Sequence, residues 1–266
     1  MIEFLPAIGA ESARFLAAIE SIDAAGTALT DVRVPACPDW NAADLAWHLT
    51  EVQAFWATMV GGGLSSPAEA EMPERPADDQ VLALFAEQSE RLVSVLTDGA
   101  DEDPCWSWHP TGGNIGWVRR RQAQEALIHR IDAEQTAALV TAAPLSDVDE
   151  VLATDGIDEM IQIMLSSEPL PEWGRFEPSD RSLRITVPQR SWDLTIGRVV
   201  GTNDDGPQDA GAVRVEEDPL ASPGATLTGS AAEIDLWLWR RGLLTDASVR
   251  GNQAVVQEVY DFSSVE

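Results

Sequence analysis

Lysine is absent from this sequence, and its absence excludes several kinds of chemistry. All 17 basic residues among the 266 are arginine, whereas 45 residues are acidic, so the formal net charge is −28. Catalysis through a lysine Schiff base and nucleotide binding by a P-loop both require a lysine. Nucleic-acid binding depends on Lys and Arg side chains that neutralise phosphates. A chain this acidic is therefore not expected to bind DNA or RNA.

Long apolar segments, a secretory signal and a cysteine framework are missing as well. The apolar runs are far shorter than the roughly 20 residues that span a bilayer. The first residues lack the basic and apolar regions of a signal peptide. The two cysteines, Cys37 and Cys105, form no metal-like pair and are expected to be small apolar filler residues. We therefore expect a cytoplasmic protein without a membrane segment.

The first half of the chain has apolar residues at helical spacing. Helices are predicted over residues 7–26, from Asn41 to the glycines at 61–63, over 78–96 and over 115–139. Asn41 followed by Asp44 is typical of a helix start, and two prolines in residues 34–40 preclude helix there. Four helices joined by short or moderate loops predict an antiparallel four-helix bundle. We assign it to residues 1–145.

The second half has a different pattern. One more helix is predicted over residues 147–165, and beyond Pro171 the apolar residues alternate with a period of two. Such alternation indicates short strands, here separated by turn-rich stretches such as residues 201–211. A final helix is predicted over residues 229–242. The fold class is therefore α+β, with a smaller α+β domain over residues 146–266 after the bundle.

Histidine is scarce, so the positions of the three histidines are informative. Glu125 and His129 are four residues apart in the fourth predicted helix, which places them on one face, and Asp132 lies three residues further along. His48 lies in the apolar stripe of the second predicted helix. Two histidines and a carboxylate form a known metal-binding set. The alternative is a simple helix-surface pair of Glu125 and His129 with His48 in the core, and spacing alone leaves both open.

Two segments carry a resemblance to a known family. The segment CPDWNAADLAWHLTEV, residues 37–52, resembles the CPGW…DLxxHL segment of the mycothiol-dependent maleylpyruvate isomerase family, which belongs to the wider DinB-like metal-binding bundles. The segment RRRQAQEALIHRIDAEQTA, residues 119–137, is similar to the second motif of that family. Residues 153–161 and 226–242 resemble its C-terminal domain. The resemblance covers nearly the whole chain.

The resemblance implies a metal site and a thiol cosubstrate. In the family, the residues matching His48, Glu125 and His129 bind a divalent metal, usually zinc, inside the bundle. The remaining position takes water or mycothiol, the cysteinyl sugar thiol of actinobacteria, and the metal would deprotonate that thiol. Two positions depart from the family pattern: Asp39 stands where glycine is frequent, and Gln124 stands where many members have a second histidine.

Several arginines are candidates for recognition of an anionic substrate. Arg240 and Arg241 resemble an arginine that the family directs from its C-terminal domain toward the active site. A guanidinium fork suits a carboxylate, but charge complementarity at a helix C-terminus explains the same residues. The arginines of the fourth predicted helix are expected on its solvated face; they are Arg119, Arg120, Arg121 and Arg130.

The loop before the fourth predicted helix holds the third histidine. His109 lies there between Trp108 and Pro110, and we expect an exposed loop histidine. The alternative is that His109, together with Trp106 and Trp108, lines the pocket.

The leading hypothesis is a zinc-dependent, mycothiol-dependent enzyme. The metal-bound thiolate would act in S-transfer to an electrophile or in cis-trans isomerisation of a maleylpyruvate-like substrate, so the partners are a small thiol and a small electrophilic or anionic molecule. One alternative is a non-catalytic metal-binding or thiol-binding sensor on the same bundle. Another is a purely structural bundle in which Glu125 and His129 merely pair.

Overall fold

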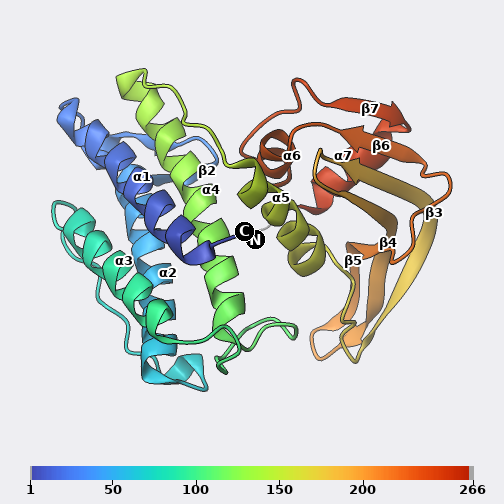
Figure 1. Cartoon of the computed structure of the whole chain (residues 1–266), viewed down its shortest axis with the longest axis horizontal. Coiled ribbons are helices and arrows are strands. Elements are labelled where there is room, and N and C mark those ends of the chain that lie inside the picture. Colours follow the sequence, from blue (N-terminus) through green and yellow to red (C-terminus); the bar gives the residue numbers. More distant parts are fainter. Residues whose placement is uncertain (1, 264–266) are drawn as a thin grey trace. The chain divides into compact units, whose positions relative to one another are not determined.

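The computed structural model describes residues 2–263 and contains two compact units, which meet in the sequence between Asp147 and Val148. The first unit is helical, and the second combines helices with a mixed β-sheet (Figure 1). The predicted fold class, a four-helix bundle followed by an α+β part, is confirmed.

Four long helices make up the first unit: α1 (Phe4–Ala24), α2 (Ala42–Gly62), α3 (Val81–Asp98) and α4 (Ile115–Thr141). Helix α1 packs against α3 and α4, and α2 packs against the same two helices. A 3-10 turn (Leu29–Asp31) and a small hairpin of β1 (Arg33–Val34) and β2 (Cys37–Asn41) connect α1 to α2. A second 3-10 turn (Pro67–Glu69) lies between α2 and α3.

Helix α2 has a well-defined beginning and end. The side chain of Asn41 accepts hydrogen bonds from the backbone N–H groups of Ala43 and Asp44, at 2.9 and 3.0 Å, and the Asp44 carboxylate accepts from the N–H of Asn41 at 3.0 Å. This is a capping box, which satisfies helix N–H groups that lack an intrahelical partner. Gly63, at φ 57°, ends the helix in the left-handed conformation that favours glycine. These caps fix His48 in the second turn of α2.

The apolar core of the bundle draws on all four helices and on the hairpin. Phe15 of α1 and Phe85 of α3 are almost completely buried, with ring centroids 4.9 Å apart. They pack with other buried apolar residues: Ile19, Ile22, Val34, Leu45, Leu49, Val81, Ala133 and Ala137. Cys37 and Cys105 are half-buried and form no disulfide.

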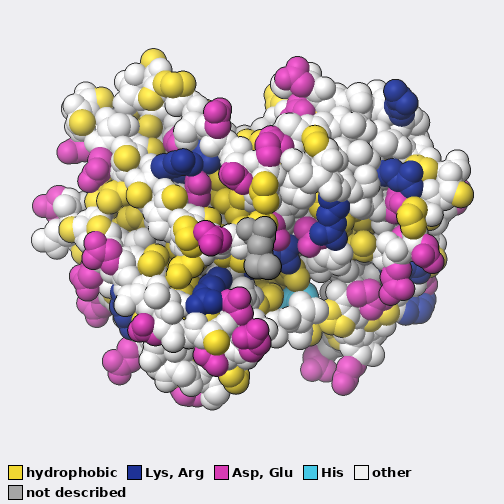
Figure 2. Space-filling view, viewed as in Figure 1, with side chains coloured by type: hydrophobic (Ala, Val, Ile, Leu, Met, Phe, Trp, Pro, Cys, Tyr) yellow, Lys and Arg dark blue, Asp and Glu magenta, His cyan; other side chains and the backbone are white. Residues whose placement is uncertain are grey.

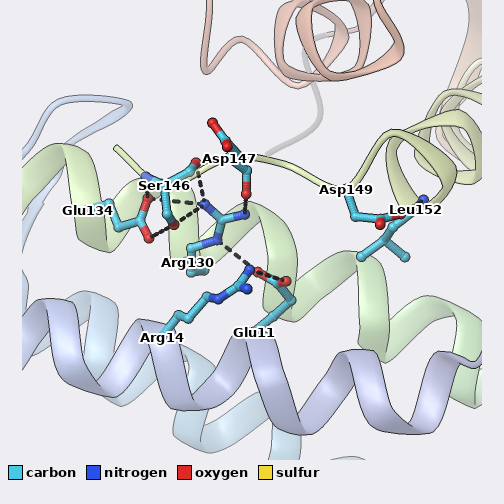
Figure 3. A network of polar contacts seen from close by, with 8 residues as sticks. All are labelled: Glu11, Arg14, Arg130, Glu134, Ser146, Asp147, Asp149 and Leu152. Carbon is cyan, nitrogen blue, oxygen red and sulfur yellow. Dashed lines mark hydrogen bonds and ion pairs between the residues drawn. The ribbon is translucent and has the colours of Figure 1, made fainter. Parts of the chain in front are cut away.

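A buried ion network surrounds Arg130 of α4 (Figure 3). Its side chain is 0% exposed; Nε donates to Glu11 of α1 at 2.8 Å, and Nη1 donates to Glu134 at 3.0 Å. Nη1 also donates to the carbonyl and hydroxyl oxygens of Ser146, and Nη2 donates to the carbonyl of Asp147. The prediction that Arg130 lies on a solvated face is therefore wrong, because α1 and the segment after α4 cover this side of the helix.

The second unit contains one sheet and three helices. Helix α5 (Glu150–Glu159) continues into a π-helical turn (Met160–Met164). The strands are β3 (Gly174–Thr186), β4 (Ser191–Asn203), β5 (Gly206–Val215), β6 (Ala225–Thr228) and β7 (Ser248–Gly251), and the remaining helices are α6 (Ala231–Leu238) and α7 (Gln253–Phe262). The sheet order is β5-β4-β3-β6-β7, antiparallel except for the parallel pair of β3 and β6.

Alternating burial explains how this sheet forms. Leu183 and Ile185 of β3 and Leu194 and Ile196 of β4 are fully buried, as their two-residue spacing predicts. Helix α7 packs against β3, β5 and β6, and α5 packs against α6.

Two predictions for the second unit are corrected. The turn-rich stretch 201–211 is mostly strand, since β4 and β5 continue through it to a tight connection before Gly206, whose φ is 108°. The helix predicted as the last is α6, and α7 follows it.

No helix in the described part of the chain is long and apolar enough to cross a membrane. Acidic side chains are spread over the face seen in Figure 2, with fewer basic side chains between them.

Candidate metal centre

His48 reaches the centre from α2 and is supported by an aromatic ring. Its side chain is about one-third exposed. The ring of Trp40, at the end of β2, lies against the imidazole with the centroids 4.7 Å apart and the planes tilted by 38°. The hairpin therefore supplies a packing partner for the histidine of the helix that follows it.

Glu125 and His129 reach the centre from α4. Their four-residue spacing places them one turn apart, with Glu125 Oε1 and His129 Nε2 separated by 3.2 Å. His48 Nε2 lies 3.6 Å from the same carboxylate oxygen, and the two imidazole rings meet edge to face with centroids 4.8 Å apart. The structure thus brings together the three residues that the spacing singled out.

The three side chains fit a divalent metal. One ligand atom from each lies within 4.8 Å of the others, and this is the one such group of His, Cys, Asp or Glu within residues 2–263. Zinc bound tetrahedrally at about 2.0–2.2 Å from nitrogen and oxygen ligands holds adjacent ligand atoms about 3.3 Å apart. The observed distances of 3.2 and 3.6 Å to Glu125 Oε1 are close to that value. Two imidazoles and one carboxylate also suit iron or nickel.

Two buried side chains contact the ligands of α4. Asp132 is fully buried, and its carboxylate accepts a hydrogen bond from His129 Nδ1 at 3.0 Å. Arg121, with a side chain only 5% exposed, donates from Nη2 to Glu125 Oε2 at 2.9 Å. The prediction of a solvated face is therefore wrong for Arg121 too, because its partner is an acid one turn away at the centre of the bundle. Arg121 and Glu125 are four residues apart in the sequence, and this spacing indicates a contact between them on one helix face.

These contacts set the charges at the centre. Burial raises the pKa of Glu125, but hydrogen bonds from His129 and His48 and the charge of Arg121 outweigh it and hold the pKa well below its ordinary value. Burial lowers the pKa of His129, but its hydrogen bonds to Asp132 and Glu125 outweigh that effect and raise the pKa to about 9. In the metal-free protein at neutral pH, Glu125 is thus an anion and His129 a cation. A metal must displace the proton on His129 Nε2.

Comparison with known proteins identifies the first unit. The family model of the mycothiol maleylpyruvate isomerase N-terminal domain matches residues 5–134, which include all three candidate ligands. The first unit belongs to this domain family. The resemblance to mycothiol-dependent maleylpyruvate isomerases noted from the sequence motifs is thereby confirmed.

Two solved structures share the fold of the maleylpyruvate isomerase family with this chain. One is the mycothiol-dependent maleylpyruvate isomerase, with 12% sequence identity, a TM-score of 0.59, and coverage of 93% of this chain and 91% of that one. The other is a mutant of that isomerase with a histidine changed to alanine, with 13% identity, a TM-score of 0.56, and coverage of 90% and 89%. The structural similarity shows a shared fold, whereas identity this low leaves the activity open. No curated protein matches the sequence.

The two departures from the isomerase family pattern are sequence neighbours of Trp40 and Glu125. Asp39 is exposed in β2, and its carbonyl accepts a hydrogen bond from Arg33 at 3.2 Å. Gln124 is fully buried, but as the neighbour of Glu125 it points from a different face of α4. Neither residue takes the place of one of the three candidate ligands.

The loop before α4 contributes an aromatic cluster to the bundle. The ring of Trp106 packs against Phe55 and Trp56 of α2, with centroids 5.9 Å apart in both cases. Trp108 is 47% exposed. His109 is half-buried rather than exposed; its Nδ1 is 2.7 Å from the hydroxyl of Thr111, and burial lowers its pKa. The contacts of His109 lie within its own loop.

Arg240 and Arg241 follow α6 in the second unit, and their surroundings differ. Arg240, at φ 61°, donates to the carbonyl oxygens of Tyr260 and Asp261 at 2.7 and 3.2 Å, and its guanidinium lies over the Tyr260 ring at 4.6 Å. These contacts hold the C-terminal end of α7. Arg241 is half-buried and donates from Nη1 to the carbonyl of Trp239 at 2.7 Å.

Proposed function

We propose that this protein is a zinc-dependent, mycothiol-dependent enzyme of the maleylpyruvate isomerase type, with the metal held by His48, Glu125 and His129. The observation that carries the proposal is the convergence of these three ligand atoms from two helices of a bundle that belongs to this domain family. The proposal includes a cytoplasmic location.

The donor set suits thiol chemistry. A bound dication lowers the pKa of a coordinated thiol, so the thiol reacts as a thiolate near neutral pH. Glu125 contributes one negative charge, and the two imidazoles are neutral when they coordinate. With a dication held by His48, Glu125 and His129, the centre would keep a net positive charge, which would favour a bound thiolate.

The same thiolate serves two reactions. In isomerisation, the sulfur would add to one carbon of a cis double bond conjugated to a carbonyl, and the electrons of that double bond would move to the carbonyl as an enolate. The resulting single bond would rotate, and return of the enolate electrons would expel the sulfur and restore the double bond as trans. In S-transfer, the new carbon–sulfur bond would remain, and either the enolate carbon would take a proton from solvent or the electrophile's leaving group would depart with the electron pair. From the family resemblance we keep both Arg240 and Arg241 as candidates for recognition of an anionic substrate; the Arg240 guanidinium contacts two carbonyl oxygens and the ring of Tyr260.

The metal assignment is tested by elemental analysis of protein purified without added metal. Wild type is expected to hold about one metal ion per chain, whereas His48→Ala and His129→Ala are expected to lose it. His109→Ala is the matched control, because it removes the one other histidine of the chain. Equal metal content in all four proteins would refute the assignment.

Turnover is tested separately on the metal-loaded protein. Mycothiol binding is measured by calorimetry, and activity is followed as formation of the trans isomer from maleylpyruvate and as thiol consumption with a panel of electrophiles. Product in either assay supports an enzyme. Binding of mycothiol without any product identifies a sensor on the same bundle.

A further inference from the structure

Each of the three candidate ligands contacts a different side chain that restricts its orientation. From this arrangement we infer that Asp132, Arg121 and Trp40 are positioning residues, which determine the ligand atoms that face the metal. The inference rests on the metal site proposed above.

Asp132 determines which nitrogen of His129 is available. Its fully buried carboxylate holds the Nδ1–H of His129 at 3.0 Å, so Nε2 is the nitrogen that points toward Glu125 Oε1. A histidine that binds a metal through one nitrogen commonly donates its other N–H to a carboxylate, which fixes the tautomer and the ring orientation. The three-residue spacing on α4 makes this contact within the helix itself.

Arg121 determines how Glu125 binds. Its Nη2 engages Oε2 at 2.9 Å, while Oε1 is the oxygen closest to both histidines. A carboxylate with one oxygen held by a guanidinium offers the other oxygen alone to a metal. Arg121 would thus direct Glu125 to bind a metal through Oε1.

Trp40 restricts His48 in a weaker way. The His48 ring has Nε2 3.6 Å from Glu125 Oε1, meets the His129 ring edge to face at 4.8 Å, and packs against the Trp40 indole at 4.7 Å. A ring contact limits the tilt of the imidazole but does not select between its nitrogens. The expected order of effect on metal affinity is therefore Asp132, then Arg121, then Trp40.

The test measures zinc affinity by competition with a chelating dye, and the geometry of the site by the visible spectrum of the cobalt-substituted protein. Asp132→Ala is expected to weaken zinc binding about 10- to 100-fold. Asp132→Asn keeps an oxygen acceptor of the same shape and is expected to recover part of that loss. Arg121→Gln is expected to weaken zinc binding less than Asp132→Ala does and to change the cobalt spectrum. Trp40→Leu is expected to lower the zinc affinity about threefold or less.

Two surface variants serve as matched controls. Glu51→Gln removes an exposed acid from α2, and Arg91→Gln removes an exposed arginine from α3. Both are expected to bind zinc as wild type does, with unchanged cobalt spectra. Circular dichroism checks the fold of every variant, and Asp132→Asn carries the comparison if Asp132→Ala does not fold.

The outcomes separate this inference from the metal assignment. If wild type binds no metal, the proposed function fails. If wild type binds zinc and both Asp132 variants bind it equally well, with wild-type cobalt spectra, the metal site stands and the positioning role is refuted. Equal weakening by Asp132→Asn and Asp132→Ala would also refute it, since the acceptor oxygen would then have no effect.

Discussion

Replacement of Arg130 by methionine should cost the bundle about 3 kcal/mol of unfolding free energy. Removal of one partner of a buried ion pair typically costs about 3–5 kcal/mol, because a buried charge is left uncompensated. Here Glu11, which is 4% exposed, keeps a 3.1 Å contact with Arg14, and Glu134 keeps its hydrogen bond from the N–H of Ser146. These remaining contacts favour the lower end of that range.

A double variant separates the loss of an ion pair from a general packing defect. Arg130→Met combined with Glu11→Leu removes both charges of the Arg130–Glu11 pair between α1 and α4. Since well-packed apolar residues often replace a buried ion pair without loss, the second change should recover at least half of what the first costs. Arg91→Met, on the exposed side of α3, is the control and should stay within about 0.5 kcal/mol of wild type.

Urea unfolding followed by circular dichroism at 222 nm measures these differences, because the bundle holds the longest helices. A loss below about 1 kcal/mol for Arg130→Met would show that the buried network contributes little. A double variant less stable than Arg130→Met alone would contradict the ion-pair explanation.

Three further predictions follow from single contacts. In the metal-free protein the pKa of His129 is raised from 6.5 to about 9. The stabilisation from protonated His129 is therefore fully present below about pH 6.5 and is lost as the pH rises through about 9. The urea midpoint should fall across this range for wild type and should not fall for His129→Gln. Asn41→Ala should lower the free energy of unfolding by about 1 kcal/mol through loss of the α2 cap, measured by urea titration, and Asn41→Ser should not. Gly156→Ala should lower the free energy of unfolding by about 1–3 kcal/mol, because the added methyl group would lie 2.6 Å from the Asp235 carboxylate. An unchanged melting temperature would contradict this close approach of α5 and α6.

The placement of Glu125 and His129 on one helix face was predictable from the sequence because helical spacing is local information, whereas the choice of a metal centre over a simple pair came from the family resemblance. Glu125 and His129 share a face of α4 by their spacing alone, and the scarcity of histidine left few partners from other helices. Spacing does not tell which face of a helix another element covers. The pattern therefore predicts a solvated face for Arg121 and Arg130, although both are buried and paired with acidic side chains.

The second unit was harder to predict because some of its strand residues are types that favour turns. The polar stretch 201–211 contains an aspartate pair and three glycines, which indicate a turn, yet cross-strand pairing extends β4 and β5 through it. Helix α7 has an amphipathic pattern in the sequence, with Val255, Val256 and Val259 on its buried side. Pairing between distant segments cannot be read from local patterns, whereas the pattern of α7 can.

The hairpin that precedes α2 ties the metal centre to the folding of a larger segment. Trp40, which packs on His48, and Asn41, which caps the helix, are consecutive residues at the end of β2. Opening of the two short strands would remove the cap and the aromatic support together, without touching a ligand. Metal bound at His48 should therefore slow amide hydrogen exchange across residues 33–48 as one cooperative unit.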